Sequence, residues 1–162
     1  MSRHIQLISN LPFLSNKRKL SLFLPFFLMR VKVIKLDDDM RKLELLLPLN
    51  WMSKNAAGNM FGGYQASLAD PVPALVCAQK FPGYRVATKH LTLDFIRVGS
   101  SDLTLHLAFD EAIEAQIRSE LEAHGRSTPT FTMVYTRADG KVCTEIKNTV
   151  AIRPKGYIGK HD

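Results

Sequence analysis

The sequence predicts an α+β domain in which an antiparallel sheet wraps around a single buried helix. Segments with alternating apolar residues, as half-buried strands have, occur in pairs along the chain. Between the first two pairs, Gly63–Lys80 is rich in Ala, Leu and Val on every side, as expected of a helix inside the core. The 162 residues are enough for one domain. We place this domain at 30–157, after a leader at 1–29 and before a short tail at 158–162.

The first strand pair is predicted at 30–38 and 43–49. Val31 and Val33 alternate with lysines, and the apolar pattern then shifts toward Ile34, which predicts a β-bulge in the first strand. The second strand carries leucines at alternate positions and ends in a segment that contains proline.

Proline, glycine and aspartate residues mark the remaining boundaries. Pro71 and Pro73 predict that the buried helix kinks or splits. Asp110 and Gly125 are a typical N-cap and C-cap for a second helix, and Asp139-Gly140 indicates a hairpin with a type I′ turn. The elements between these boundaries are strands at 84–98 and 103–109, a helix at 111–124, and hairpin strands at 128–137 and 141–153.

A glycine pair at the start of the buried helix and an acid two turns later suggest a reaction. Because seven residues span about two helical turns, Gly63 and Asp70 lie on one face. The free N–H groups of a helix start stabilise a developing oxyanion, and a carboxylate activates water or attacks a carbonyl. This combination suggests hydrolysis of an acyl thioester. Asp70 also precedes Pro71, and aspartate followed by proline is a standard helix start, so a purely capping role stays open.

A longer motif around these residues resembles the hotdog-fold thioesterases, in particular the small phenylacetate-pathway type with its N-x-x-G-x-x-H-G-G…A-D pattern. Phe61 stands where that pattern has histidine. A run that extends to Pro71, Phe95 and Lys155-Gly156 is more similar still to the DUF4442 group, which is related to tetrameric acyl-CoA thioesterases. The resemblance covers about 30–157 and implies the hotdog fold, a sheet wrapped around a central apolar helix. The positions in register with the first pattern are Asn55, Gly58, Gly62, Gly63, Ala69 and Asp70.

The resemblance also implies roles for individual residues. Asp70 is expected to act as general base or nucleophile across a dimer interface, against the Gly63 amide of the other subunit. Asn55 is expected to hold the thioester carbonyl or the water, with the stabilisation of a turn as the alternative. The implied substrate contacts are Phe61 against the acyl chain, Gly62 beside the oxyanion, and Ser67, which either positions water or bonds back to its own helix.

The chain carries a net charge of +7, with a pI of about 9.6, and its cations are spread along the sequence. A nucleic-acid-binding surface would concentrate them on one element together with aromatic residues, so we expect no nucleic-acid partner. Coenzyme A, a small polyanion, fits a diffuse positive rim better. Arg97, Arg153 and Lys155 lie at predicted strand ends and are candidates for binding its phosphates, although solubility alone also explains the charge.

The leader contains an apolar run at 20–29 that follows basic residues. No small-residue cleavage site follows it, it is about half the length that a membrane span needs, and Pro25 interrupts it. We therefore expect one or two short helices, broken near Pro25, that cover the fold or line an acyl pocket. Contact with a membrane surface is the lesser alternative.

The sequence thus predicts a homodimeric or homotetrameric acyl-CoA thioesterase that needs no metal and no redox cofactor. Cys77 and Cys143 are expected to be small core residues in a reducing compartment, the cytoplasm, and the five histidines have no metal-ligand spacing. A hotdog hydratase or dehydratase would need a histidine near its acid, and 55–84 contains none. A non-catalytic module that binds or senses acyl-CoA would keep the fold and the pocket, and this alternative stays open.

Overall fold

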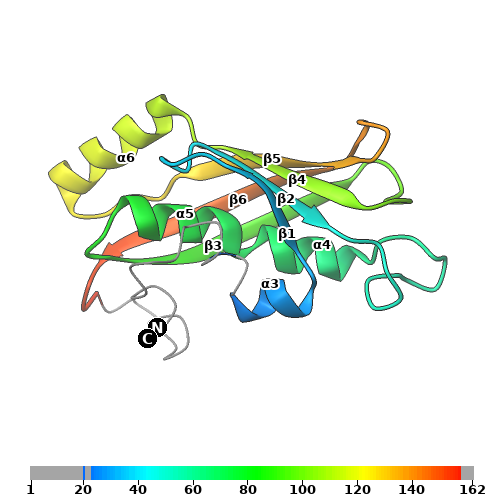
Figure 1. Cartoon of the computed structure of the whole chain (residues 1–162). Coiled ribbons are helices and arrows are strands. Elements are labelled where there is room, and N and C mark those ends of the chain that lie inside the picture. Colours follow the sequence, from blue (N-terminus) through cyan, green and yellow to red (C-terminus); the bar gives the residue numbers. More distant parts are fainter. Residues whose placement is uncertain (1–19, 21–22, 158–162) are drawn as a thin grey trace.

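The structure, a computed structural model, describes Leu20 and residues 23–157. Most of the predicted leader, at 1–19, 21 and 22, and the predicted tail at 158–162 lie outside the described residues. The described part contains a six-stranded antiparallel sheet (Figure 1). The strands are β1 (Lys32–Leu36), β2 (Lys42–Leu47), β3 (Tyr84–Phe95), β4 (Leu103–Ala108), β5 (Thr130–Arg137) and β6 (Val142–Pro154). The helices are α3 (Leu24–Leu28), α4 (Gly62–Ala69), α5 (Pro71–Lys80) and α6 (Glu111–His124).

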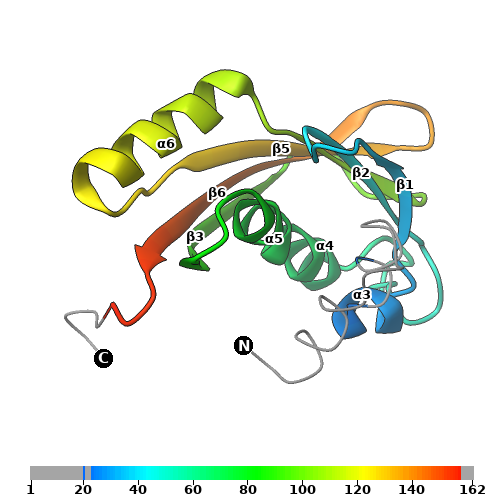
Figure 2. The ribbon, with the colours of Figure 1, turned by 60° about the vertical axis from the view of Figure 1, so that its left-hand side comes forward.

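The sheet has the strand order β1-β2-β4-β5-β6-β3 and curves around α4 and α5 (Figure 2). The alternating leucines of β2 and β4 are buried, as their spacing predicted, and each buried leucine stabilises the fold by roughly 1.5–3 kcal/mol. The central helix packs against the concave face of the sheet (Figure 2), so the predicted architecture is confirmed, but its other side is open: Ser67, Asp70 and Ala78 are exposed, and the helix is not buried on every side as its composition suggested. The buried leucines of these two strands are Leu43, Leu45, Leu47, Leu103, Leu105 and Leu107.

Among the described residues, β3 is an edge strand that pairs with β6 alone. The register between them shifts between Thr88 and His90, so that Lys89 is the additional residue of a β-bulge. Before the bulge, the side chain of Thr88 faces the helices. The bulge shifts the alternation of side chains by one residue, so the side chain of Phe95 also faces the helices although it lies an odd number of residues further along the strand. Within the described residues the second edge of β3 is unpaired along its whole length. The bulge predicted in the first strand is also present, at a register shift in β1.

Three local predictions need correction. The strand that was expected to reach position 98 ends at Phe95. Asp110 occupies the N-cap position of α6, but its side chain makes no capping hydrogen bond. The turn of the final hairpin is not type I′, because φ is positive at Gly140 and not at Asp139. The Gly140 N–H donates to the Arg137 carbonyl at 2.9 Å, which gives a three-residue loop with a left-handed glycine.

The apolar run of the leader is partly described, and it packs on the domain. Pro25 is the second residue of α3 and does not break it, because the N–H at that position has no partner inside a helix. Phe26 is fully buried, and the ring of Phe23 meets it edge-on with centroids 5.0 Å apart. This segment therefore covers part of the core, as expected. Within 23–157, no helix combines the length and the apolarity needed to cross a bilayer.

A charge cluster fixes α6 beyond the C-terminal end of α5 (Figure 1). Glu114 of α6 accepts hydrogen bonds from Lys80 at 3.0 Å and from Arg118 at 2.6 Å, and its side chain is only 13% exposed. The hydrogen bond from Arg118 is the main reason why the pKa of Glu114 lies below its usual value of 4.5, although burial opposes the shift. This cluster lies at the end of the central helix opposite to the glycine pair and takes no part in the site.

Candidate functional site

Asp70 lies between α4 and α5 with its side chain exposed. Its backbone stays helical, at φ −57° and ψ −58°, and its N–H donates to the Ala66 carbonyl at 2.9 Å. An N-cap residue normally has an extended backbone and a side chain bonded to the first turn, and Asp70 has neither. The capping alternative is therefore not what the structure shows. Within the described residues the carboxylate has no hydrogen-bonding or ion-pair partner, so it is available to water or to a substrate.

The glycine pair forms the first two residues of α4, and its two N–H groups have no partner among the described residues. Phe61, the N-cap residue, is extended at φ −67° and ψ 129°. A Cβ on Gly62 would lie 2.9 Å from the Phe95 ring, and a Cβ on Gly63 would overlap the Phe61 ring. Phe61 is 52% exposed and Phe95 is 56% exposed, so two aromatic rings that solvent reaches lie close to the glycine pair.

The carboxylate and the amides of one chain are too far apart to act on the same carbonyl. Seven residues at about 1.5 Å of rise each separate Gly63 from Asp70 by about 10 Å along the helix. A base and an oxyanion donor must both come within roughly 3 Å of the reacting atoms. Sharing one helix face, as the sequence predicted, therefore does not bring these groups into one site within a single chain.

Asn55 and Ser67 both bond to nearby backbone in the structure. The Asn55 Oδ1 atom accepts hydrogen bonds from the N–H groups of Ala57 at 3.0 Å and Asn59 at 3.1 Å, which closes a turn. Its Nδ2 group has no partner within the described residues and is free to donate. The Ser67 hydroxyl donates to the Gly63 carbonyl at 2.8 Å, so the back-bonded alternative is the one observed. Neither contact prevents Asn55 from donating to a substrate carbonyl.

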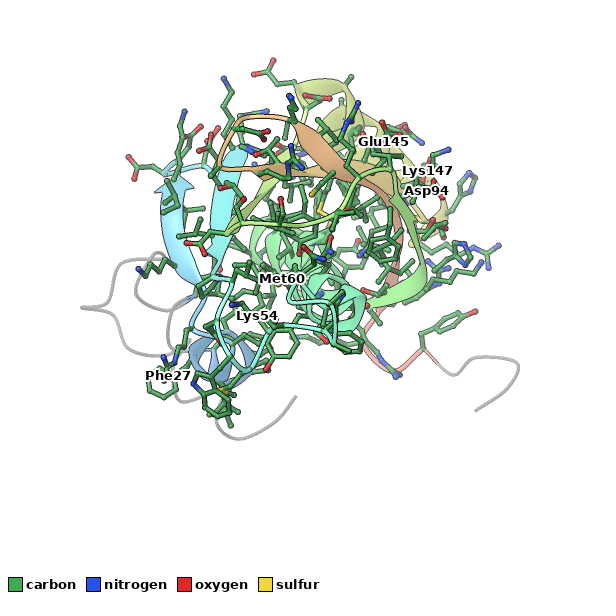
Figure 3. The ribbon with its side chains drawn as sticks, turned by 90° about the vertical axis from the view of Figure 1, so that its right-hand side faces the viewer. Phe27, Lys54, Met60, Asp94, Glu145 and Lys147 are labelled. Carbon is green, nitrogen blue, oxygen red and sulfur yellow. The ribbon has the colours of Figure 1, made fainter. Side chains whose placement is uncertain are left out.

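The loop that carries Asn55 is fixed beside the start of α4. Lys54 pairs with Met60 in an isolated antiparallel bridge, and the Met60 N–H donates to the Gly99 carbonyl at 2.8 Å. Figure 3 shows Lys54 and Met60 next to each other, while Asp94 and Glu145 lie well away on the outer side of the sheet. Asp94 is exposed there.

The three predicted phosphate-binding cations lie at opposite ends of the β3–β6 pair. The Arg97 N–H bonds to the Cys143 carbonyl, which is ten strand residues, or roughly 33 Å, from Arg153. The Arg153 guanidinium donates to the Ser127 and Ile152 carbonyls and, at 2.9 Å, to the Thr128 hydroxyl, so it is largely engaged within the chain. An open cavity of about 350 Å³ lies at this end, lined by His124, Gly125, Arg126, Pro154 and Tyr157. Within one chain, Arg97 therefore cannot bind the same phosphate as Arg153 and Lys155.

A row of buried polar groups under the central helix was missed by the sequence analysis. Gln65 of α4 accepts a hydrogen bond on its side chain from Thr144 at 2.6 Å and on its carbonyl from the Tyr135 hydroxyl at 2.9 Å. Burial is the main cause that raises the pKa of Tyr135 well above its usual value of 10. Asn148 and Thr88 hold the helix further along, near Asp70. The sequence pattern that could have revealed these groups is the presence of polar residues at inward-facing positions of a strand, where they alternate with isoleucine and valine residues of the core.

No protein-family model and no curated protein matches the chain. Solved structures do. A Pseudomonas aeruginosa protein of unknown function, named a probable thioesterase, has 19% identity and a TM-score of 0.71 over 80% of this chain and 86% of its own. A Haemophilus influenzae thioesterase has 12% identity and a TM-score of 0.66 over 89% and 91%. A mutant of a Staphylococcus aureus thioesterase has 15% identity and a TM-score of 0.63 over 79% and 97%.

These similarities extend over most of each chain and match a sheet wrapped around a central helix. The chain has the hotdog fold. At such identities the comparisons show the architecture and leave the reaction to be argued from the site. Membership of the DUF4442 group within the hotdog proteins stays a prediction, since no family model matches.

Proposed function

We propose that this hotdog protein is an acyl-CoA thioesterase that acts as a dimer or a larger assembly of identical chains. The observation that carries the proposal is the position of two unpartnered groups along the free edge of β3. Thr88 donates to the Asp70 main-chain carbonyl at 2.9 Å, so residue 70 lies beside one part of this edge strand. Phe95 touches Gly62, which places the oxyanion donors level with another part. One chain thus offers both halves of a site that it cannot close by itself.

Antiparallel pairing of two β3 edges would close the site. A two-fold axis at Thr92 places Phe95 of one chain opposite the bulge at Thr88 and Lys89 of the other, because the bulge sets two residues against one. The glycine amides of one subunit then face Asp70 of the partner subunit, and the same contact occurs twice because the interface is symmetric. Pairing also satisfies the exposed backbone groups of a twelve-residue edge strand.

The reaction that fits these groups is hydrolysis. In the general-base route, Asp70 takes a proton from water as the hydroxyl oxygen adds to the thioester carbonyl carbon. The Gly63 amide, with Gly62 beside it, donates to the oxyanion that forms. The carbon–sulfur bond then breaks, the carboxylic acid leaves, and the coenzyme A thiolate receives the proton from Asp70. In the nucleophilic route, the Asp70 carboxylate adds to the thioester carbonyl carbon and the carbon–sulfur bond breaks, which releases the coenzyme A thiolate and leaves a mixed anhydride. Water then cleaves the anhydride to the free acid and the Asp70 carboxylate, and the proton that this step releases goes to the thiolate.

The spacing of residues in a structural neighbour supports these assignments. The Staphylococcus aureus protein has been crystallised with a glutamine replaced by alanine and, separately, with a glutamate replaced by alanine. Those two positions are fifteen residues apart, as Asn55 and Asp70 are here. An amide side chain and a carboxylate at the same spacing favour Asn55 as the group that holds the thioester carbonyl or the water, through its free Nδ2.

The proposed pairing also gathers the predicted phosphate-binding cations. Two strands that run antiparallel about Thr92 bring Arg97 of one subunit level with the β3–β6 end of the other, where Arg153 and Lys155 lie. Only in the assembly do the three cations thus come together as one positively charged surface for the phosphates of coenzyme A. Aromatic rings at Phe61 and Phe95 are left beside the oxyanion for the acyl group. No metal or redox cofactor is needed for this reaction.

A non-catalytic acyl-CoA binding or sensing module is the second candidate, because Phe61 replaces a histidine of the related thioesterases. One experiment separates the two. Purified protein is assayed for thiol release from acyl-CoA thioesters of increasing chain length, and acyl-CoA binding is measured by calorimetry. We expect Asp70→Asn to lower kcat at least about 100-fold without loss of binding. The matched control is Asp110→Asn, which also removes an exposed, non-capping carboxylate near a helix start.

Turnover that survives in a folded Asp70→Asn protein would exclude the mechanism. Binding without turnover in the parent protein, on every thioester of the series, would favour the binding module. An equal loss in Asp110→Asn would mean that net charge, and not the carboxylate at position 70, controls the rate.

A further inference from the structure

Asn148 of β6 lies directly under the split in the central helix. It is fully buried, and its side chain points toward the end of α4. The two hydrogens of its Nδ2 group reach two successive carbonyls, Ala69 at 3.1 Å and Asp70 at 2.9 Å. Its Oδ1 atom has no partner within the described residues, although it is buried. The amide is therefore held in place by its donor side alone.

The reason for these contacts lies in the prolines. In a continuous helix the Ala69 carbonyl would accept from the N–H of residue 73, but Pro73 has none. A buried carbonyl without a partner is costly, and Asn148 supplies the missing donor from the neighbouring sheet. Thr88 of β3 adds a second donor to the Asp70 carbonyl at 2.9 Å. Two strands thus hold the one residue at which the helix is interrupted.

We propose that Asn148 is a positioning residue for the hydrolytic reaction, which keeps the helix split in the shape that turns the Asp70 carboxylate toward the free edge of β3. This inference rests on the proposed function. An apolar residue of similar size would pack in the same place without leaving a buried oxygen unpaired. The chain retains an amide there, and its two hydrogens go to the carbonyls of two successive peptides, Ala69–Asp70 and Asp70–Pro71.

The test compares Asn148→Ala with Thr144→Val. Thr144 also bonds to the central helix from β6, through Gln65, but it does so one turn before Asp70. We expect Asn148→Ala to lower kcat at least about 10-fold with KM changed less than about twofold, and Thr144→Val to leave kcat within about twofold. Equal losses of kcat in both variants would reduce the role of Asn148 to general support of the helix and overturn the proposal.

Amide hydrogen exchange provides a readout that does not depend on activity. In Asn148→Ala, exchange of the Asp70 N–H should accelerate at least about 10-fold, while exchange in the core of β5 stays unchanged. If acyl-CoA is not hydrolysed by the parent protein, this result still tests the contact, so the two proposals fail separately. Unchanged exchange at Asp70 would contradict the positioning role. Should Asn148→Ala fail to fold, Thr88→Val removes one donor from the same carbonyl with a smaller loss of packing.

A second substitution separates positioning from simple satisfaction of a carbonyl. Pro73→Ala in the Asn148→Ala background returns a main-chain N–H to the Ala69 carbonyl and allows the helix to straighten. We expect this double variant to recover protection from exchange without recovering kcat. Recovery of both would show that any donor to Ala69 suffices, and the proposal would be wrong.

Discussion

A complementation experiment tests whether the site is shared between subunits. One chain carries Asp70→Asn and the other carries Gly63→Pro, and each variant alone is expected to lose activity. Proline removes the N–H of Gly63 without costing the helix a bond, because this N–H has no partner and proline is tolerated in the first helical turn. Pro25 already occupies the corresponding position of α3. The Phe61 ring, which is half exposed, has to turn aside.

The expected recovery follows from the distance between the two groups. Because about 10 Å of helix separates them in one chain, each site needs Asp70 from one subunit and the glycine amides from the other. A heterodimer of the two variants then contains one site with both groups intact and one with both groups altered. Heterodimers purified through two different affinity tags should have about half of the parent kcat per dimer.

The assay is thiol release from one acyl-CoA at saturating concentration. The homodimer of each variant should be at least about 100-fold below the parent, the magnitude measured when a base or an oxyanion donor is removed in other enzymes. Heterodimers as inactive as the homodimers would refute the shared site and place both groups in one chain. Gly62→Pro in the same pairing identifies which of the two amides meets the oxyanion.

Three further results are expected. Strands paired about Thr92 should allow Thr92→Cys chains to form a disulfide dimer on mild oxidation, whereas Ala87→Cys, whose two copies would be more than about 20 Å apart, should not; the reverse outcome contradicts the register. The native thiols should not interfere, since both are buried and burial raises the pKa of Cys77 to about 12. Arg97→Ala and Lys155→Ala should each raise KM with little change in kcat, and should make KM less sensitive to salt. Arg153→Ala should have the same effect on KM and should also lower the free energy of unfolding, because the hydrogen bond from the Arg153 guanidinium to Thr128 is lost. Unchanged KM in all three variants would assign the charge to solubility. Glu114→Gln should lower the free energy of unfolding at pH 7 by about 1–3 kcal/mol, measured by urea denaturation, with exposed Glu122→Gln as control. Because the pKa of Glu114 is lowered in the folded state, its contribution is present above pH 4.5 and is lost as the pH falls through the folded-state pKa, so parent and variant should converge in acid; a constant difference down to pH 2 counts against this account.

The fold was predictable because burial follows the strand period almost everywhere. The leucines of β2 and β4 alternate without interruption, and the central helix buries the face that packs on the sheet, while Ser67, Asp70 and Ala78 on its other side are exposed. The hairpin turn was predicted less well, because Asp139-Gly140 fits both a two-residue type I′ turn and a three-residue loop, which differ in loop length and in the sign of φ at the aspartate. Local sequence does not decide between them when the flanking strands set the twist.

The site was predictable in its parts and not in its arrangement. Asp70 and the glycine pair could be named from sequence, but Asp70-Pro71 fits a cap as well as a reactive acid, and only the helical backbone at Asp70 separates the two. Asn148 could not be found in this way. Its partner is the Ala69 carbonyl, which Pro73 leaves open and which lies 79 positions earlier in the chain, so the connection exists only after the sheet has closed around the helix.

The unpaired edge of β3 also has a kinetic consequence. In the assembly proposed above, a newly folded chain exposes a long row of backbone donors and acceptors until it meets a second copy, and any extended segment can bind there in the meantime. The time for which the edge stays unpaired depends on the rate at which two chains meet, and therefore on the concentration of the protein. The bulge at Lys89, with its local twist and its charge, limits the flat stretch open to the wrong partner. Correct assembly needs a chain concentration at which two copies meet soon after folding. Overproduction at low temperature raises this concentration and shortens the time for which the edge is unpaired, whereas dilution during refolding lowers the concentration and lengthens that time.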